Sequence, residues 1–235
     1  MLLDDEGNEL LLPKTEQIPS DFYRKGETVR AVVARVDNKN NNPKIILSRT
    51  SPMFLQRLFE QEVPEINDGL ITIKKIARIP GERAKIAVES YDERIDPVGA
   101  CVGMNGQRVN AIVNELRGEK IDIINWSDNP AILIENALSP AKVISVAADP
   151  EEKTASAIVP DYQLSLAIGK EGQNARLAAR LTGFKIDIKS ETQAREAGEL
   201  GELEIYEEEY EETPAEESAE AVYEEEVSAE ETAEE

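Results

Sequence analysis

The stretch Val102-Gly103-Met104-Asn105-Gly106-Gln107-Arg108 returns further along the chain as Ile168-Gly169-Lys170-Glu171-Gly172-Gln173-Asn174, with both glycines and the glutamine at the same spacing. The residues downstream also recur, because Lys-Ile-Asp-Ile stands at 120–123 and again at 185–188. Similarity that repeats at a fixed period indicates two copies of one supersecondary unit. The sequence therefore predicts two small domains, each carrying a G-x-x-G turn.

Helix and strand signals place the turn at the same point in both copies. Ser51-Pro52 and Asn129-Pro130 each join an N-cap residue to a proline at the first helical position, which predicts a helix start. Further helices are expected from 96, from 105 or 106, from 161 and from the second turn to 181, and strands at 69–79, 83–88, 120–126, 143–147, 154–159 and 185–189. Each copy thus has the order α-β-β-α-α-β, over 51–127 and 128–190.

This order, with G-x-x-G between two helices, is that of the type II (prokaryotic) KH domain, whose turn clamps the backbone of about four nucleotides. Glycines without a Cβ let phosphates approach closely, and the amides at the start of the next helix attract anions. The fold class predicted is α+β, with two tandem KH domains. The predicted RNA-binding residues lie in or just after the turns: Gly103, Met104, Asn105, Gly106, Gln107 and Arg108, then Gly169, Lys170, Glu171, Gly172, Gln173, Asn174, Arg176 and Arg180.

Other interpretations of these residues stay open. Glycines often end helices as C-caps, although two turns in register with the same following strand favour the functional interpretation. Gln107 and Gln173 are as well suited to packing the turn as to contacting RNA. The apolar residues expected beside the turns could line a base-binding groove or belong to the core: Val102, Val109 and Ile112, and Ile168, Ala175 and Leu177.

The charge near the two turns differs. The first copy has only Arg108 close to its turn, whereas the second has Lys170, Arg176 and Arg180, partly offset by Glu171. Cations that neutralise phosphates make binding salt-dependent. We therefore expect the second copy to contribute more of the salt-dependent affinity.

Residues 1–50 are predicted to form part of a β-barrel of the OB type. A hairpin over the first twelve residues and strands at 28–36 and 45–47, separated by turn-forming residues, support this. A possible RNA face carries Arg24, Lys25, Arg30 and Arg35, although such residues also occur on ordinary solvated strands. Residues 1–49 are expected to be the least stable folded region.

The net charge of −22 is concentrated at the C-terminus, since 191–235 contain 20 Glu and one Arg. This acidic tail is predicted to be disordered. It either stays solvated or acts by competing with RNA for basic surfaces or by docking on a basic partner.

Composition also narrows the function classes. The chain has no histidine and one cysteine, Cys101, which is expected to be a buried hydrophobe. No catalytic constellation, metal site or cofactor is predicted, so an enzyme is not expected. Without an apolar run that could span a bilayer or a basic leader, a cytoplasmic protein is expected.

Longer stretches resemble the NusA family of bacterial transcription elongation, termination and antitermination factors. They include Ile45-Ile46-Leu47-Ser48-Arg49-Thr50-Ser51-Pro52, Phe59-Glu60-Gln61-Glu62-Val63-Pro64-Glu65-Ile66, Asp96-Pro97-Val98-Gly99-Ala100-Cys101-Val102-Gly103 and Ala167-Ile168-Gly169-Lys170-Glu171-Gly172-Gln173-Asn174. The resemblance implies an OB barrel and two KH domains that bind nascent single-stranded RNA. It also implies association with RNA polymerase and other Nus-type factors. The protein is expected to be a monomer and to make no contact with a membrane.

The sequence departs from the family at its start. Family members begin with a polymerase-binding domain, and here that domain and the first barrel strands are expected to be missing, through a truncated gene model, a mis-assigned start or a split gene. Two other functions are kept as alternatives. One is an RNA-binding fragment with a ribosome- or ribonuclease-associated role; the other is an adaptor that binds protein partners through the acidic tail.

Overall fold

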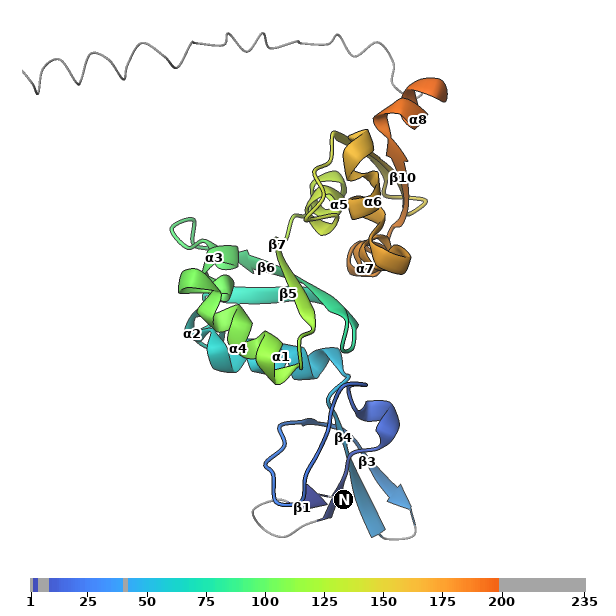
Figure 1. Ribbon diagram of the computed structural model, residues 1–235. Helices are drawn as coiled ribbons and strands as arrows, with labels where there is room; N and C mark the ends of the chain where they lie inside the picture. The colour runs from blue at the N-terminus through green and yellow to red at the C-terminus, as the bar shows by residue number, and fades with distance from the viewer. Residues whose placement is uncertain (1, 4–8, 40–41, 199–235) are drawn as a thin grey trace, which may run out of the picture. The chain divides into compact units, whose positions relative to one another are not determined.

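The structure is a computed structural model that describes residues 2–3, 9–39 and 42–198 (Figure 1). The part of the predicted acidic tail from 199 to 235 lies outside the described residues. The described chain contains an N-terminal sheet followed by two units with the same order of elements.

The N-terminal sheet has the strand order β1-β2-β4-β3. Strands β1 (Leu2–Leu3) and β2 (Glu9–Leu11) pair antiparallel, which confirms the predicted hairpin. Strand β3 (Val32–Lys39) pairs antiparallel with β4 (Asn42–Ser48), and β2 runs parallel to β4. The strand predicted at 28–36 begins only at Val32. Strands thus precede the repeated units, and their assignment to an incomplete OB barrel stays a prediction.

The first unit follows the predicted order of a KH domain. Ser51 caps helix α1 (Pro52–Glu62) by accepting a hydrogen bond from the amide of Met53. The remaining elements are α2 (Pro64–Asn67), β5 (Ile71–Ile79), β6 (Arg83–Ser90), α3 (Pro97–Val102), the 3-10 turn η2 (Met104–Gly106), α4 (Gln107–Glu115) and β7 (Lys120–Asn125). The one-turn helix α2 and the 3-10 turn η2 were not predicted as separate elements. In the sheet, β6 pairs antiparallel with β5 and parallel with β7.

The second unit repeats this topology. Its elements are α5 (Pro130–Ala137), β8 (Ser145–Asp149), β9 (Thr154–Val159), the 3-10 turn η3 (Asp161–Gln163), α6 (Leu164–Ile168), the 3-10 turn η4 (Lys170–Gly172), α7 (Gln173–Thr182) and β10 (Lys185–Ser190). Strand β9 pairs antiparallel with β8 and parallel with β10. The predicted α+β class with two tandem KH domains is therefore confirmed.

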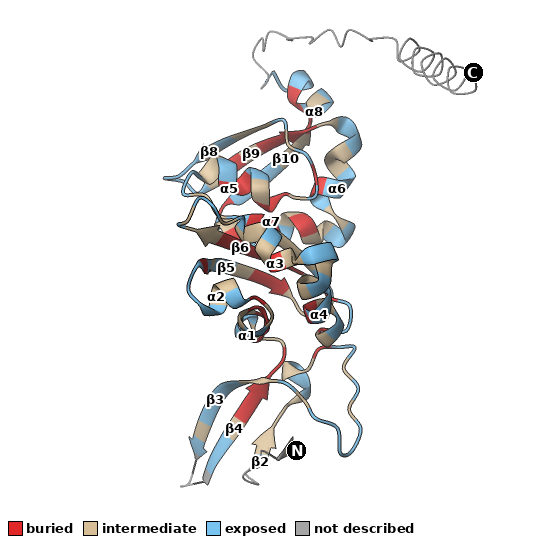
Figure 2. Ribbon diagram, turned by 90° about the vertical axis from the view of Figure 1, so that its left-hand side faces the viewer, coloured by how far each residue is buried: buried red, intermediate tan, exposed pale blue. Residues whose placement is uncertain are grey.

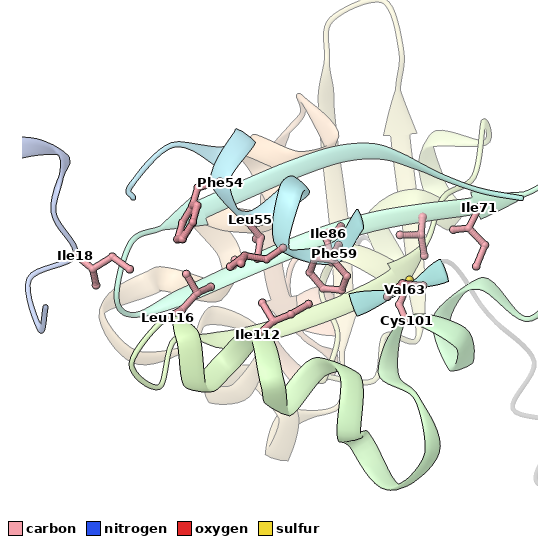
Figure 3. Packing of buried hydrophobic residues seen from close by; sticks show 13 residues of the cluster. Ile18, Phe54, Leu55, Phe59, Val63, Ile71, Ile86, Cys101, Ile112 and Leu116 are labelled. Atoms are coloured by element: carbon pink, nitrogen blue, oxygen red, sulfur yellow. The ribbon is translucent and has the colours of Figure 1, made fainter. Parts of the chain in front are cut away.

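Helices α1 and α4 pack on one face of the first sheet. Phe54, Leu55 and Phe59 of α1 meet Ile112 of α4 and Leu116, which directly follows α4, in this core (Figure 3). Cys101 lies in the same cluster with no exposed surface, as predicted, and its burial raises the pKa of its thiol to about 12. This cysteine is a packing residue.

The opposite face of the first sheet is covered by the second KH domain. Ala77, Ala87 and Ile124 of the first sheet share a core with Leu177 and Leu181 of α7. Figure 2 shows α5 and α7, with buried residues in red, between the two sheets. The two KH domains are therefore joined by a continuous hydrophobic core.

A buried lysine adds a polar contact across this junction. Lys85 on β6 has no exposed surface, and its Nζ donates to the carbonyl of Ser139 at 2.6 Å and to Asp122 at 2.8 Å. Burial lowers the pKa of Lys85, while the Asp122 carboxylate opposes this shift. The lysine thereby links the first sheet to the segment after α5.

A short helix, α8 (Glu191–Glu196), begins directly after β10. Ser190 forms a capping box with Gln193, Ala194 is fully buried, and Thr192 bonds to Asp161. The predicted disorder is therefore wrong for 191–196, because an Ala among the polar residues packs against the domain. None of the helices in the described part is long and apolar enough to cross a membrane.

Candidate nucleic-acid interface

The two glycine turns have the same backbone conformation. The first glycine has φ 75° and ψ 169° at Gly103, and φ 77° and ψ 170° at Gly169. The second glycines, Gly106 and Gly172, are left-handed with φ of 75° and 72°. The amide of Gly106 donates to the carbonyl of Gly103 at 3.0 Å, and the second turn has the matching bond at 3.1 Å. The sequence repeat is thus a repeat of geometry.

The first glycine of each turn is required for packing within the protein. A Cβ on Gly103 would lie 2.7 Å from Cγ of Arg108, and one on Gly169 would lie 2.8 Å from Cβ of Asn174 and 2.9 Å from its backbone nitrogen. These glycines also have a φ and ψ that are essentially restricted to glycine. This close contact, between residues five positions apart, was not predicted from the spacing of the glycines.

The second glycine of the second turn faces open space. A Cβ on Gly172 would meet nothing within 4 Å, whereas one on Gly106 would lie 3.1 Å from Nδ2 of Asn110. The residue before each of these glycines, Asn105 or Glu171, is also left-handed, with φ of 52° and 53°. A backbone that is bent and uncovered at this point leaves room for a ligand beside the start of the next helix.

Each turn leads directly into a helix. Helices α4 and α7 begin at Gln107 and Gln173, whose own amides donate to the carbonyls of Met104 and Lys170 in the turns. The first amides of a helical turn have no acceptor within it, and the helix dipole adds positive potential at this end. The turn and helix start together can therefore bind an anion such as a phosphate.

Two predicted contact residues use their side chains for bonds within the protein, although the Arg108 side chain stays 30% exposed. Asn174 is 1% exposed, and its Nδ2 donates to the carbonyls of Leu138 at 3.0 Å and Ala167 at 2.9 Å. Arg108 donates to Glu65 at 2.9 Å and to the carbonyl of Ala100 at 2.6 Å. Both side chains fasten the helix after the turn to the helix before it.

The two glutamines differ in their surroundings. Gln107 is exposed, whereas Gln173 is partly buried and donates to Glu82 in the turn between β5 and β6. This hydrogen bond supports the interpretation that Gln173 packs the turn, and it joins the second glycine turn to the first KH domain.

Exposed cationic side chains lie in and after the second turn. Lys170, Arg176 and Arg180 are all exposed, and the Arg176 guanidinium donates to the carbonyl of Glu171 at 3.2 Å. The position matching Lys170 in the first turn is Met104, whose side chain is 79% exposed. The two turns therefore have the same shape and different electrostatics.

The apolar candidates beside the turns divide into core and surface residues. Ile112 and Leu177 are fully buried, Val102, Val109 and Ala175 are partly buried, and Ile168 is exposed.

A cleft of about 480 Å³ lies between the two KH domains and was not predicted. Its apolar lining includes Val98 of α3, Ile123 of β7 and Val143. Ile123 belongs to the repeated Lys-Ile-Asp-Ile strand, and this repeat was the one feature of the sequence that could have pointed to the cleft.

The structure does not bring the N-terminal basic residues together with the glycine turns. Arg24, Lys25, Arg30 and Arg35 are exposed. Arg35 pairs with Asp37 on its own strand at 3.3 Å, and Arg24 lies over the ring of Phe22 at 5.9 Å. Of these four residues, Arg30 alone approaches a KH helix, at 3.9 Å from Glu115.

Within 2–3, 9–39 and 42–198 there is no group of acidic or cysteine side chains that could hold a metal ion.

Two protein families match the chain. The NusA-like first KH domain matches residues 49–126, and the NusA-like second KH domain matches residues 130–196. The second match reaches residue 196 and so includes α8, whereas the predicted boundary of this domain is 190.

Several curated proteins are similar to the chain. The transcription termination/antitermination protein NusA of Bacillus subtilis (strain 168) is 58% identical over 190 residues, covering 81% of this chain and 51% of that protein. The protein of that name from Halalkalibacterium halodurans is 57% identical over 192 residues, covering 82% and 50%. The one from Mycobacterium tuberculosis (strain ATCC 25618 / H37Rv) is 50% identical over 189 residues, covering 80% and 54%. The chain thus spans about half the length of these relatives.

Proposed function

Because this chain belongs to the NusA family, we propose that it is an RNA-binding transcription factor that holds single-stranded RNA by its two G-x-x-G turns. Its target is the nascent transcript at RNA polymerase, where other Nus-type factors join it in pausing, termination and antitermination. The chain acts by binding and carries out no catalysis.

The observation that carries this proposal is the identical backbone of the two turns. Each turn has a left-handed second glycine next to the start of a helix of nine or ten residues. Helices of this length develop a positive N-terminal potential that suits phosphate oxygens. The exposed glycine edge of the second turn supports close approach of a sugar-phosphate backbone.

The shared core supports binding of one RNA strand by both turns. Leu177 and Leu181 on α7 pack against the first sheet, and Gln173 at the start of α7 bonds to the first KH domain. Turns held in a fixed relation need no further ordering when the second one binds, which lowers the entropic cost of binding. The unpredicted cleft between the domains offers apolar surface for bases that pass from one turn to the other.

RNA titration at several salt concentrations tests the proposal. It also tests whether the second turn contributes more of the salt-dependent affinity than the first. Lys170→Ala and Arg176→Ala should each weaken binding of single-stranded RNA and lower the salt slope by about 0.7 for each lost phosphate contact. Arg108→Ala should change the slope less, because its guanidinium is already bonded to Glu65 and Ala100. Arg94→Ala serves as the control, since this side chain is 89% exposed, is paired with Asp92 and belongs to neither turn.

Two outcomes would contradict these statements separately. Absence of RNA binding by the unsubstituted protein would overturn the proposed function. If Arg108→Ala lost as much affinity and slope as Lys170→Ala, the turns would contribute equally and the predicted inequality would be wrong.

A further inference from the structure

The segment that follows α5 bonds to side chains of both KH domains through two neighbouring carbonyls. The Leu138 carbonyl accepts a hydrogen bond from Nδ2 of Asn174 at 3.0 Å, and the Ser139 carbonyl accepts one from Nζ of Lys85 at 2.6 Å. Asn174 is the second residue of α7, directly after the second glycine turn, whereas Lys85 lies on β6 in the first sheet. Side chains from the two domains therefore meet on adjacent peptide units.

The Asn174 end of this link reaches the glycine turn itself. Its Nδ2 also donates to the carbonyl of Ala167, just before the turn, at 2.9 Å. A Cβ on Gly169 would lie 2.8 Å from Cβ of Asn174, so the Asn174 side chain packs directly beneath this glycine. The place of the second turn thus depends on where Asn174 lies, and Asn174 is tied to Leu138.

The Lys85 end is fixed to the first sheet by charge. Lys85 has no exposed surface, and its Nζ lies 2.8 Å from Oδ2 of Asp122 on the neighbouring strand β7. Arg83 donates two further hydrogen bonds to the same carboxylate, at 2.7 and 2.9 Å. A buried ammonium is tolerated only when it is paired and hydrogen-bonded, and the Asp122 carboxylate and the Ser139 carbonyl supply these partners. Lys85 therefore joins the first sheet firmly to the segment after α5.

The second sheet has no lysine at the matching position. Lys85 lies opposite Asp122 across the first sheet, and in the second sheet Ser156 lies opposite Asp187. Within the described part of the chain, Oγ of Ser156 is buried without a hydrogen-bond partner. The Asp187 side chain is 66% exposed, against 17% for Asp122. The lysine is thus present in the sheet whose face packs against α7, and serine takes its place in the other sheet.

We propose that Lys85 is a positioning residue for RNA, which fixes the second glycine turn relative to the first through the Leu138-Ser139 peptide and Asn174. The inference rests on the proposed function and names the contact that sets the spacing at which one strand meets both turns. Lys85 itself touches no RNA, since it has no exposed surface. Such a link raises the affinity for an RNA that spans both turns, because the second contact then forms at a higher effective concentration. It has no effect on an RNA that fills one turn.

Binding of a short and a long RNA separates positioning from direct contact. An RNA of about four nucleotides fills one turn, and one of about twelve spans both. Lys85→Met keeps the apolar stem of the side chain and removes its charge and its N–H groups. This variant should bind the longer RNA about fivefold more weakly and the shorter RNA with unchanged affinity. Its salt slope should equal that of the unsubstituted protein, because no phosphate contact is lost, whereas Lys170→Ala should lower the slope.

Nuclear magnetic resonance supplies readouts that a loss of stability alone would not move. In the free Lys85→Met variant, the amide signals of residues 168–174 should shift, while those of 103–107 stay in place. In the unsubstituted protein, the Nζ signal of Lys85 should shift when RNA fills the second turn. This second measurement requires no folded variant. The matched control is Lys189→Met, which removes a lysine paired with Asp187 at 3.3 Å on the second sheet and should change neither affinity.

The outcomes that overturn the inference are distinct from those that overturn the proposed function. Lys85 would not be a positioning residue if Lys85→Met bound the longer RNA as tightly as the unsubstituted protein, or lost no more than Lys189→Met. An equal loss for both RNA lengths, a salt slope lowered as in Lys170→Ala, or an unmoved Nζ signal would also contradict the inference. If the unsubstituted protein bound neither RNA, the proposed function itself would be overturned.

Discussion

The two glycines of the second turn should respond differently to alanine. At Gly172 the new Cβ enters open space, so Gly172→Ala costs only the left-handed conformation, about 1 kcal/mol. At Gly169 the Cβ would lie 2.9 Å from the backbone nitrogen of Asn174, and φ and ψ are restricted to glycine. Backbone strain of about 2 kcal/mol and overpacking of about 2 kcal/mol together give about 4 kcal/mol.

Urea unfolding and RNA titration of the two variants measure both effects. We expect Gly169→Ala to reduce the free energy of unfolding by about 3 kcal/mol more than Gly172→Ala does. Gly172→Ala, although folded, should bind single-stranded RNA about tenfold more weakly, because its Cβ occupies the space beside the helix start. Equal destabilisation by the two substitutions would refute the packing role of Gly169. Unchanged RNA binding by Gly172→Ala would refute the role of the open edge.

Three further predictions concern stability. Arg49→Lys keeps the charge but loses most of the five hydrogen bonds that Arg49 donates to Asp21, Arg30 and Glu115, so the free energy of unfolding should fall by about 3 kcal/mol in chemical denaturation; a change below about 1 kcal/mol would contradict the role of these bonds. Burial raises the pKa of Asp21, but hydrogen bonds from Arg49 and Tyr23 outweigh this and lower it from 3.8. Stability from Asp21 should therefore be present above about pH 4 and be lost as the pH falls further, and Asp21→Asn should flatten that part of a pH series. A chain ending at 190 should be about 1 kcal/mol less stable than one ending at 198, because it lacks α8 and its capping box; equal thermal unfolding would contradict this.

Local signals in the sequence predicted most of the elements correctly. Ser51 and Asn129 each accept the capping bond expected of them, and both helices start at the following proline. The Lys-Ile-Asp-Ile stretches form β7 and β10 in equivalent places. These features depend on residues close together in the chain, which is why spacing and residue type were sufficient.

The parts that could not be predicted depend on contacts between distant residues. Leu177 was a candidate for the base-binding groove, yet it is buried against the first sheet. Nothing in the helix that contains it distinguishes an apolar stripe that faces its own sheet from one that also covers a neighbouring domain. In the sequence, nothing distinguishes Arg49 from the other basic residues before Ser51, and only the fold brings Asp21 and Glu115 to it.

The candidate site shows the same division. The exposed cations Lys170 and Arg176 could be predicted from their spacing from the glycines. Asn174 was included for the same reason, but it lies beneath Gly169 with its amide bonded to two carbonyls. Position relative to a motif gives the backbone conformation well, whereas the direction of each side chain depends on what packs against it.

The central claim is that both glycine turns contact RNA directly, and amide chemical shifts measured during an RNA titration test it. On addition of single-stranded RNA to the full chain, we expect the largest changes at residues 103–107 and 169–173, with the two groups saturating together because α7 is packed on the first sheet. Changes that avoid both turns, or that saturate with RNA at one turn while the other stays unaffected, would contradict the claim.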